Sequence, residues 1–253
     1  LNGADMVFLA AGLGGGTGTG ATPVIAQMAK EAGILTVAIV TRPFQFEGPQ
    51  RMQKAQQGVE KLREYVDTLI VVSNDRLLEV VGNKATLLEA FALANSVLSQ
   101  GVQSISDLIS VPGLINVDFA DVRSVMGERG GAVMGVGMGK GENRAEEAVK
   151  KACCSPLLDK IEIDGATGVL ISITGPPDLR LAEINTATTM VYKAADPQAN
   201  IIFGAVVDEA LTDEVRVTII ATGFAEDLKR QSQSKRDEDR LTSPTSSLSL
   251  RAK

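Results

Sequence analysis

The first 72 residues alternate between short apolar runs and stretches with helical spacing. Residues 6–11, 34–40 and 67–72 are mostly apolar, which predicts strands that are buried on both faces. Residues 21–33 and 50–65 carry apolar side chains at helical spacing, and the alternation of strand and helix predicts a parallel sheet with right-handed crossovers. We expect the apolar face of the first helix to consist of Val24, Ile25, Met28, Ala29 and Ala32.

The longest helical pattern covers residues 86–109 and predicts a helix roughly 36 Å long. Beyond it the pattern changes, and residues 129–224 predict helices and strands of mixed direction without a phosphate loop. The polar residues 225–253 lack apolar periodicity, which predicts a disordered tail. We therefore predict an α/β fold with a parallel sheet, a long central helix and a second α/β domain with a mixed sheet. The expected segments are 1–109, 110–128, 129–224 and 225–253.

A glycine-rich stretch at residues 12–20 joins the first strand to the first helix. It contains six glycines together with Thr17 and Thr19. A glycine loop between a strand and a helix aims backbone N–H groups and the helix dipole at an anion, so the stretch favours phosphate binding. The alternative is a tight turn with close packing of strand and helix, which needs only one or two glycines.

Two common phosphate-binding motifs do not fit this stretch. A P-loop requires a lysine after its last glycine, but Ala21 and Thr22 follow Gly20. A dinucleotide-binding fold requires an acidic residue at the end of the next strand, where Arg42 and Pro43 stand instead. The sequence therefore argues against a P-loop enzyme, and we keep a dinucleotide oxidoreductase only as a third hypothesis.

Composition excludes several further classes of function. The 253-residue chain has a formal net charge of −6, which argues against nucleic acid as a partner. It contains no histidine, so histidine metal ligands and His-dependent triads are excluded, and we predict no metal site built from protein side chains. No apolar run approaches the roughly 20 residues of a membrane span, so we expect no direct membrane insertion. The adjacent Cys153 and Cys154 suit helix packing in a reducing compartment.

Four motifs together point to one family. Residues 14–20 read Gly-Gly-Gly-Thr-Gly-Thr-Gly, and residues 41–48 read Thr-Arg-Pro-Phe-Gln-Phe-Glu-Gly. Residues 74–78 read Asn-Asp-Arg-Leu-Leu, and residues 112–123 read Pro-Gly-Leu-Ile-Asn-Val-Asp-Phe-Ala-Asp-Val-Arg. These motifs resemble those of the tubulin/FtsZ family, and in particular its cell-division branch, FtsZ. The resemblance runs from about residue 3 to Phe224.

The resemblance implies a Rossmann-like GTPase domain that is incomplete here, because we expect the chain to lack an earlier portion of the nucleotide domain. It implies binding of GTP or GDP, with Mg²⁺ at the phosphates. The nucleotide contacts that it implies are Gly14, Gly15, Gly16, Thr17, Gly18, Glu47, Arg51, Asn74, Phe91 and Asn95. From the residues alone, Glu47 and Arg51 could equally form a helix salt bridge. Asn74 could be an N-cap, and Asn95 could bond to neighbouring backbone.

A second group of residues follows the long helix. The resemblance implies that Asn116, Asp118 and Asp121 act on the γ-phosphate that is bound by the next subunit. The alternative is helix capping, with Asp118 as the N-cap and Asp121 in the first turn. Both interpretations can hold, because a capping geometry would fix the carboxylates in place.

The resemblance also implies partners and a location. We expect head-to-tail self-association into filaments of a division ring, with accessory proteins of the ring as further partners, in the cytoplasm at the division site. Residues 201–208 resemble plastid and cyanobacterial relatives, so the plastid stroma or the mitochondrial matrix is an alternative location. The alternative function is that of a non-catalytic fragment that caps or joins such filaments.

Overall fold

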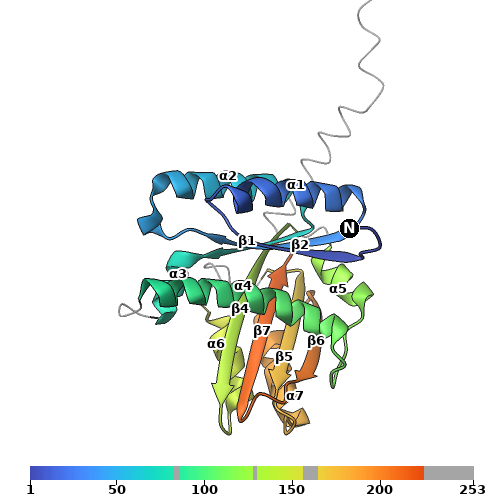
Figure 1. Ribbon diagram of the computed structural model, residues 1–253. Coiled ribbons are helices and arrows are strands. Elements are labelled where there is room, and N and C mark those ends of the chain that lie inside the picture. Colours follow the sequence, from blue (N-terminus) through green and yellow to red (C-terminus); the bar gives the residue numbers. More distant parts are fainter. Residues whose placement is uncertain (82–85, 128–129, 156–164, 225–253) are drawn as a thin grey trace, which may run out of the picture.

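The computed structural model describes residues 1–81, 86–127, 130–155 and 165–224 (Figure 1). The tail predicted at 225–253 lies outside the described residues. Within the described part, seven strands form one sheet in the order β1-β2-β3-β4-β7-β5-β6. The strands are β1 (Met6–Gly12), β2 (Leu35–Arg42), β3 (Thr68–Ser73), β4 (Gly130–Lys140), β5 (Gly168–Gly175), β6 (Asn200–Val207) and β7 (Glu214–Thr222).

The sheet changes character at β4. Strands β1, β2 and β3 are parallel neighbours, and the first three residues of β4 pair in parallel with β3. From Ala132 to Lys140, β4 runs antiparallel to β7, which is also antiparallel to β5. Strand β6 completes the sheet in parallel with β5. The predicted combination of a parallel and a mixed sheet is confirmed, and β4 belongs to both parts. The segment boundaries remain a prediction.

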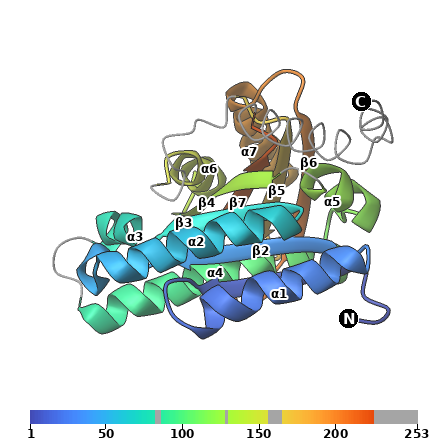
Figure 2. The same ribbon diagram turned by 90° about the horizontal axis from the view of Figure 1, so that it is seen from above.

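Helices cover both faces of the sheet (Figures 1 and 2). The helices are α1 (Thr17–Glu31), η1 (Gln45–Glu47), α2 (Pro49–Tyr65), α3 (Asn74–Val81), α4 (Leu87–Ser110), α5 (Phe119–Met126), α6 (Arg144–Cys153) and α7 (Leu181–Ala194). The pair α1 and α2 covers one face of β1–β3, and the pair α6 and α7 packs on the C-terminal strands. Helix α4 lies between the two parts, and its buried residues pack against strands of both.

The predicted central helix is confirmed as α4, which has 24 residues. Thr86 caps it, because its side chain accepts a hydrogen bond from the Glu89 N–H group and the Glu89 carboxylate accepts one from the Thr86 N–H group. This reciprocal arrangement satisfies two groups at the helix start. Within the described residues, no helix is long and apolar enough to cross a membrane.

The prediction for the first helix is wrong in two respects. Helix α1 begins at Thr17 rather than at Ala21, so its first turn lies inside the glycine stretch. The expected core residues Val24, Ile25 and Met28 are 57%, 40% and 56% exposed. The residues that α1 buries are Thr22, Pro23, Ala26 and Ala29. These side chains are small, so α1 lies close to the sheet and its larger apolar side chains point outward.

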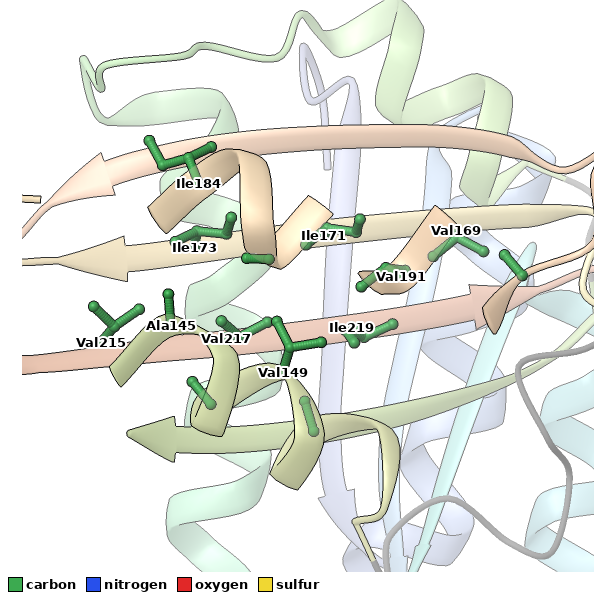
Figure 3. Packing of buried hydrophobic residues seen from close by; sticks show 14 of the residues in the cluster. Ala145, Val149, Val169, Ile171, Ile173, Ile184, Val191, Val215, Val217 and Ile219 are labelled. Carbon is green, nitrogen blue, oxygen red and sulfur yellow. The ribbon is translucent and has the colours of Figure 1, made fainter. Parts of the chain in front are cut away.

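The C-terminal strands carry the most completely buried core. Figure 3 shows α6 and α7 facing the strands, with aliphatic side chains filling the space between them. Two glycines bring α6 unusually close to β4. A Cβ atom at Gly137 would lie 2.0 Å from the Ala148 carbonyl oxygen, and one at Gly139 would lie 1.9 Å from the Arg144 carbonyl oxygen. The backbone of α6 therefore rests directly on β4.

Candidate functional site

The glycine stretch divides into an exposed part and a packed part. Gly15, Gly16 and Thr17 are exposed at the start of α1, where the first backbone N–H groups of a helix lack intrahelical partners. Gly14 is buried, has φ 100°, and donates its N–H to Thr19 Oγ1 at 2.9 Å. A Cβ atom at Gly18 would lie 2.4 Å from the Gly12 carbonyl oxygen. Gly14 and Gly18 therefore serve close packing, whereas Gly15 and Gly16 are the glycines whose exposure is compatible with anion binding.

Glu47 and Arg51 form the salt bridge that their spacing predicts. Glu47 Oε2 lies 2.5 Å from Arg51 Nη1, and Glu47 Oε1 accepts a hydrogen bond from the Phe44 N–H group at 2.8 Å. The Glu47 side chain is 10% exposed, whereas that of Arg51 is 56% exposed. Glu47 thus holds the turn after β2, and the Arg51 guanidinium remains accessible to a ligand.

Asn74 is the most informative of the predicted nucleotide contacts. It is the first residue of α3, at the carboxyl end of β3, and it is only 5% exposed. Its Oδ1 atom is buried and has no hydrogen-bond partner among the described residues. Leaving a buried amide oxygen unpaired is costly, so this position suits a donor supplied by a ligand. The alternative of an N-cap is not supported, since a cap oxygen would accept a backbone N–H.

Phe91 and Asn95 lie one turn apart on α4, and both are exposed. Phe91 contacts the buried Phe44 edge to face, with ring centroids 5.3 Å apart, and Phe44 also stacks on Phe46 at 5.0 Å. Because the Asn95 side chain is exposed, its amide needs no partner within the chain. The two side chains share one face of α4, and Phe91 reaches the turn after β2 through its contact with Phe44.

The sequence reasoning missed two residues near this end of the sheet. The Phe44 ring joins the turn after β2 to α4 through its contact with Phe91. A second aromatic residue two positions later, Phe46, is the sequence signal that could have identified Phe44. Arg42 ends β2, and its buried Nε atom has no hydrogen-bond partner among the described residues. Nothing in the local sequence pattern shows that this atom is unpaired.

Asn116, Asp118 and Asp121 lie together before and within the first turn of α5, and all three are exposed. Asn116 Oδ1 accepts the Gly113 N–H at 2.7 Å. Asp118 is the N-cap of α5, and its Oδ1 accepts the Asp121 N–H at 2.7 Å, so the capping interpretation is confirmed. In the described part of the chain, the Asp121 carboxylate makes no hydrogen bond or ion pair. Asp121 therefore offers the least engaged carboxylate of the group.

The structure does not bring the two groups of predicted residues together within one chain. The predicted nucleotide contacts lie at the carboxyl ends of β1–β3 and at the N-terminal end of α4. Asn116, Asp118 and Asp121 follow the C-terminal end of the same helix, at the opposite end of the molecule (Figures 1 and 2). A helix of this length separates its ends by about 36 Å.

Two family models match the chain. The tubulin/FtsZ family GTPase domain matches residues 1–82, and the FtsZ family C-terminal domain matches residues 130–225. The structure is similar to an empty FtsZ dimer of M. jannaschii, with a TM-score of 0.84 and 50% identity over 87% of this chain and 63% of that one. The FtsZ W319Y mutant of M. jannaschii gives the same TM-score and identity over 88% of this chain and 66% of that one.

Two more distant proteins are similar to this chain in fold. CetZ1 of Haloferax volcanii, solved as a GDP-bound monomer, has a TM-score of 0.71 at 20% identity over 93% of this chain and 70% of its own. CetZ2 of Haloferax volcanii, solved as a GTPγS-bound protofilament, has a TM-score of 0.70 at 18% identity, over 96% of this chain and 73% of its own. The chain spans just under two thirds of the M. jannaschii FtsZ chains that it matches. Together the two family models and the 50% identity show that the chain belongs to the tubulin/FtsZ family.

Proposed function

We propose that this chain is an FtsZ-like GTPase whose active site is completed by a second copy of the chain. The observation that carries the proposal is the placement of the two groups of candidate residues at opposite ends of α4. A nucleotide at one end cannot meet Asp118 and Asp121 of the same chain, but it can meet those of a neighbour stacked end to end.

Nucleotide binding rests on groups that point to a ligand. The exposed start of α1 offers backbone N–H groups and the positive end of a helix dipole to phosphates. The unpaired Asn74 oxygen suits a hydroxyl or N–H donor of a nucleoside, and the exposed Phe91 ring suits stacking on a base. We infer that the ligand is GTP or GDP. Mg²⁺ would be held mainly by the phosphates, since the described residues contain no cluster of three or more acidic or cysteine side chains that could hold a metal.

Hydrolysis requires a water molecule that is aligned with the γ-phosphate. Asp121 has an exposed carboxylate in the first turn of α5, and the cap formed by Asp118 fixes that turn. A carboxylate in this position can accept a hydrogen bond from the attacking water and orient it. Positioning and electrostatic stabilisation supply most of the catalysis in phosphoryl transfer, so a rigid turn matters more than a strong base.

Contacts between opposite ends of successive copies generate a filament, because such an interface does not close on itself. The M. jannaschii FtsZ relative was solved as a dimer, which supports self-association. We propose that the filaments belong to the division ring, in the cytoplasm at the division site, and that accessory ring proteins bind them. A location in a plastid or mitochondrion is the alternative.

A second candidate function is that of a non-catalytic partner that joins or caps filaments. It is supported by the difference between the two ends. The segment with Asn116, Asp118 and Asp121 pairs with β6 and packs in the central core, whereas β1 at the nucleotide end pairs only with β2 among the described residues. Such a chain would lack GTP affinity of its own. Binding of labelled GTP therefore separates the two candidates.

The main test mixes two variants that are each inactive. Asp121→Ala and Asn74→Ala should each abolish GTP turnover, whereas the surface control Glu60→Ala should not. In an equal mixture, about one quarter of randomly formed interfaces combine an intact Asn74 with an intact Asp121, so part of the turnover should return. No recovery on mixing, with wild-type turnover intact, would contradict a site shared between copies.

A further inference from the structure

The C-terminal end of α5 is held by two buried threonines. The last carbonyl groups of a helix lack partners within the helix and must find them elsewhere. Thr222 Oγ1 donates to the Val125 carbonyl oxygen at 2.8 Å, and Thr68 Oγ1 donates to the Met126 carbonyl oxygen. Both threonines are fully buried, so no water competes for these bonds.

These two hydroxyl groups come from different parts of the sheet. Thr68 is the first residue of β3, in the parallel part, and Thr222 is the last residue of β7, in the mixed part. A third contact comes from the start of β6, where Asn200 Nδ2 donates to Ser124 Oγ at 3.0 Å. The end of α5 is thus held by strands from both parts of the sheet.

The other end of α5 carries the candidate catalytic group. Helix α5 has eight residues, with Asp118 as its N-cap and Asp121 in its first turn. Its buried face consists of Val122, Val125 and Met126, which pack in the central core. Because the helix has only about two turns, a shift at its C-terminal end moves the Asp118 and Asp121 carboxylates almost as a rigid body.

We propose that Thr222 and Thr68 are positioning residues that aim Asp118 and Asp121 at the nucleotide of the next copy. This inference rests on the proposed function. The threonines touch no reacting atom, and they act only through α5. Small displacements of reacting groups have large effects on rate, so losing one anchor should lower turnover more than it lowers nucleotide affinity.

Thr222 allows a matched comparison. Thr222→Val keeps the shape of the side chain and removes the donor, whereas Thr222→Ser keeps the hydroxyl. Thr188→Val is the control, because Thr188 is also buried but bonds only to carbonyl groups of its own helix, α7. The readouts are kcat, GTP affinity and the hydrogen–deuterium exchange of residues 119–126.

We expect Thr222→Val to lower kcat about tenfold with little change in GTP affinity. Exchange should become faster in residues 119–126 and stay unchanged in α6 and α7. Thr222→Ser and Thr188→Val should resemble the wild type, and Thr68→Val should repeat the effect if Thr222→Val fails to fold. Unchanged exchange in residues 119–126, or equal kcat losses in Thr222→Val and Thr222→Ser, would overturn the proposal. A wild-type chain without any turnover would contradict the proposed function instead.

Discussion

The two edges of the sheet are covered in different ways. At one edge, the segment before α5 closes on β6, where Ile115 and Ala205 exchange two backbone hydrogen bonds of 3.2 and 3.0 Å. At the other edge, β1 pairs only with β2 among the described residues. The β1 sequence, Met-Val-Phe-Leu-Ala-Ala-Gly, contains no charge or proline of the kind that protects an exposed edge.

The helices that pack on the two parts of the sheet also differ. Helices α6 and α7 bury their apolar faces against the C-terminal strands (Figure 3). Helix α1 buries small residues and exposes Val24, Ile25 and Met28. The exposed apolar side chains of α1 lie together on one face, while in the C-terminal part the exposed Leu181 and Tyr192 of α7 lie near opposite ends of the helix. Helix α5 lies between the two regions, because the segment before it pairs with β6 and its buried face packs in the central core with residues of β2 and β3.

The largest expected effect concerns the contact of α6 with β4. In Gly137→Ala, the new Cβ atom would lie 2.0 Å from the Ala148 carbonyl oxygen and 2.4 Å from the Ala152 nitrogen. Because backbone atoms cannot rotate away, we expect the free energy of unfolding to fall by about 4 kcal/mol, above the usual cost of overpacking. Urea denaturation measures the loss.

The control for this change lies on α1. A Cβ atom at Gly20 meets nothing within 4 Å. Since alanine favours the helix over glycine by about 1 kcal/mol, Gly20→Ala should stabilise the chain. If Gly137→Ala and Gly20→Ala lowered the free energy of unfolding equally, the contact of α6 with β4 would be no tighter than the surroundings of Gly20 on α1.

The next effect concerns a buried arginine. The Arg144 side chain is 4% exposed and bonds to Glu183 Oε1 at 2.8 Å and to Asp178 Oδ1 at 3.0 Å. These contacts join α6 to the segment that begins α7. Arg144→Met leaves the Glu183 carboxylate, which is 14% exposed, without its partner. We expect a loss of about 3 kcal/mol, measured by thermal or urea unfolding.

A matched surface pair shows whether burial matters. Lys150 and Glu146 form an exposed ion pair on the same helix at 2.6 Å. Lys150→Met should cost less than about 0.5 kcal/mol, because exposed pairs contribute little. A comparable loss from Lys150→Met and Arg144→Met would contradict a special role for the buried arginine.

A pH effect follows from the same contact. The hydrogen bond from Arg144 lowers the pKa of Glu183 below its ordinary value of 4.5. A carboxyl with a lowered pKa in the folded state stabilises that state above its unfolded pKa, and this contribution disappears as the pH falls through its folded pKa. At pH 7, Glu183→Gln should cost about 2 kcal/mol. As the pH falls below about 4.5, the free energies of unfolding of the wild type and Glu183→Gln should converge. Urea unfolding at a series of pH values measures this. A difference between the two proteins that stays constant with pH would contradict a stabilising role for the ionised Glu183 carboxylate.

The smallest effect on stability is expected on α1. Replacing the exposed Val24 and Met28 by lysine should change the free energy of unfolding by no more than about 0.5 kcal/mol. Urea denaturation measures this change. The same substitution at the buried Val149 of α6 should leave little folded protein. A large loss of stability from the α1 changes would show that this face is packed after all.

The fold could be predicted from the sequence because its strands and long helix have strong periodic patterns. The apolar runs that form β1, β2 and β3 and the capped helix α4 lie close to where the patterns place them. Of the expected apolar face of α1, Ala29 is buried as predicted, but Val24 and Met28 are exposed, because hydrophobicity ranks these larger side chains above Ala26. The backbone of α1 approaches the sheet closely, so small side chains fill the contact and larger ones are excluded from it.

The site could be predicted in part. The Asp118 cap and the Glu47–Arg51 salt bridge follow from local spacing, and both are present. The contact of Phe44 with Phe91 and the bond from Thr222 to Val125 join segments far apart in the chain. Such pairs depend on how strands are ordered in the sheet, which short sequence patterns do not encode. The unpaired oxygen of Asn74 likewise becomes visible only once its surroundings are known.

The position of β7 has a consequence for how the chain is made. It is the last strand along the described sequence, yet it lies between β4 and β5 in the sheet. Strands β1, β2 and β3 can pair as soon as they leave the ribosome, but β4 must wait for residues 214–222 before its antiparallel partner exists. Pairing over such a separation is slow, and unpaired strands are prone to aggregation while they wait. A nascent chain that stops short of β7 would therefore lack the strand that joins its two halves.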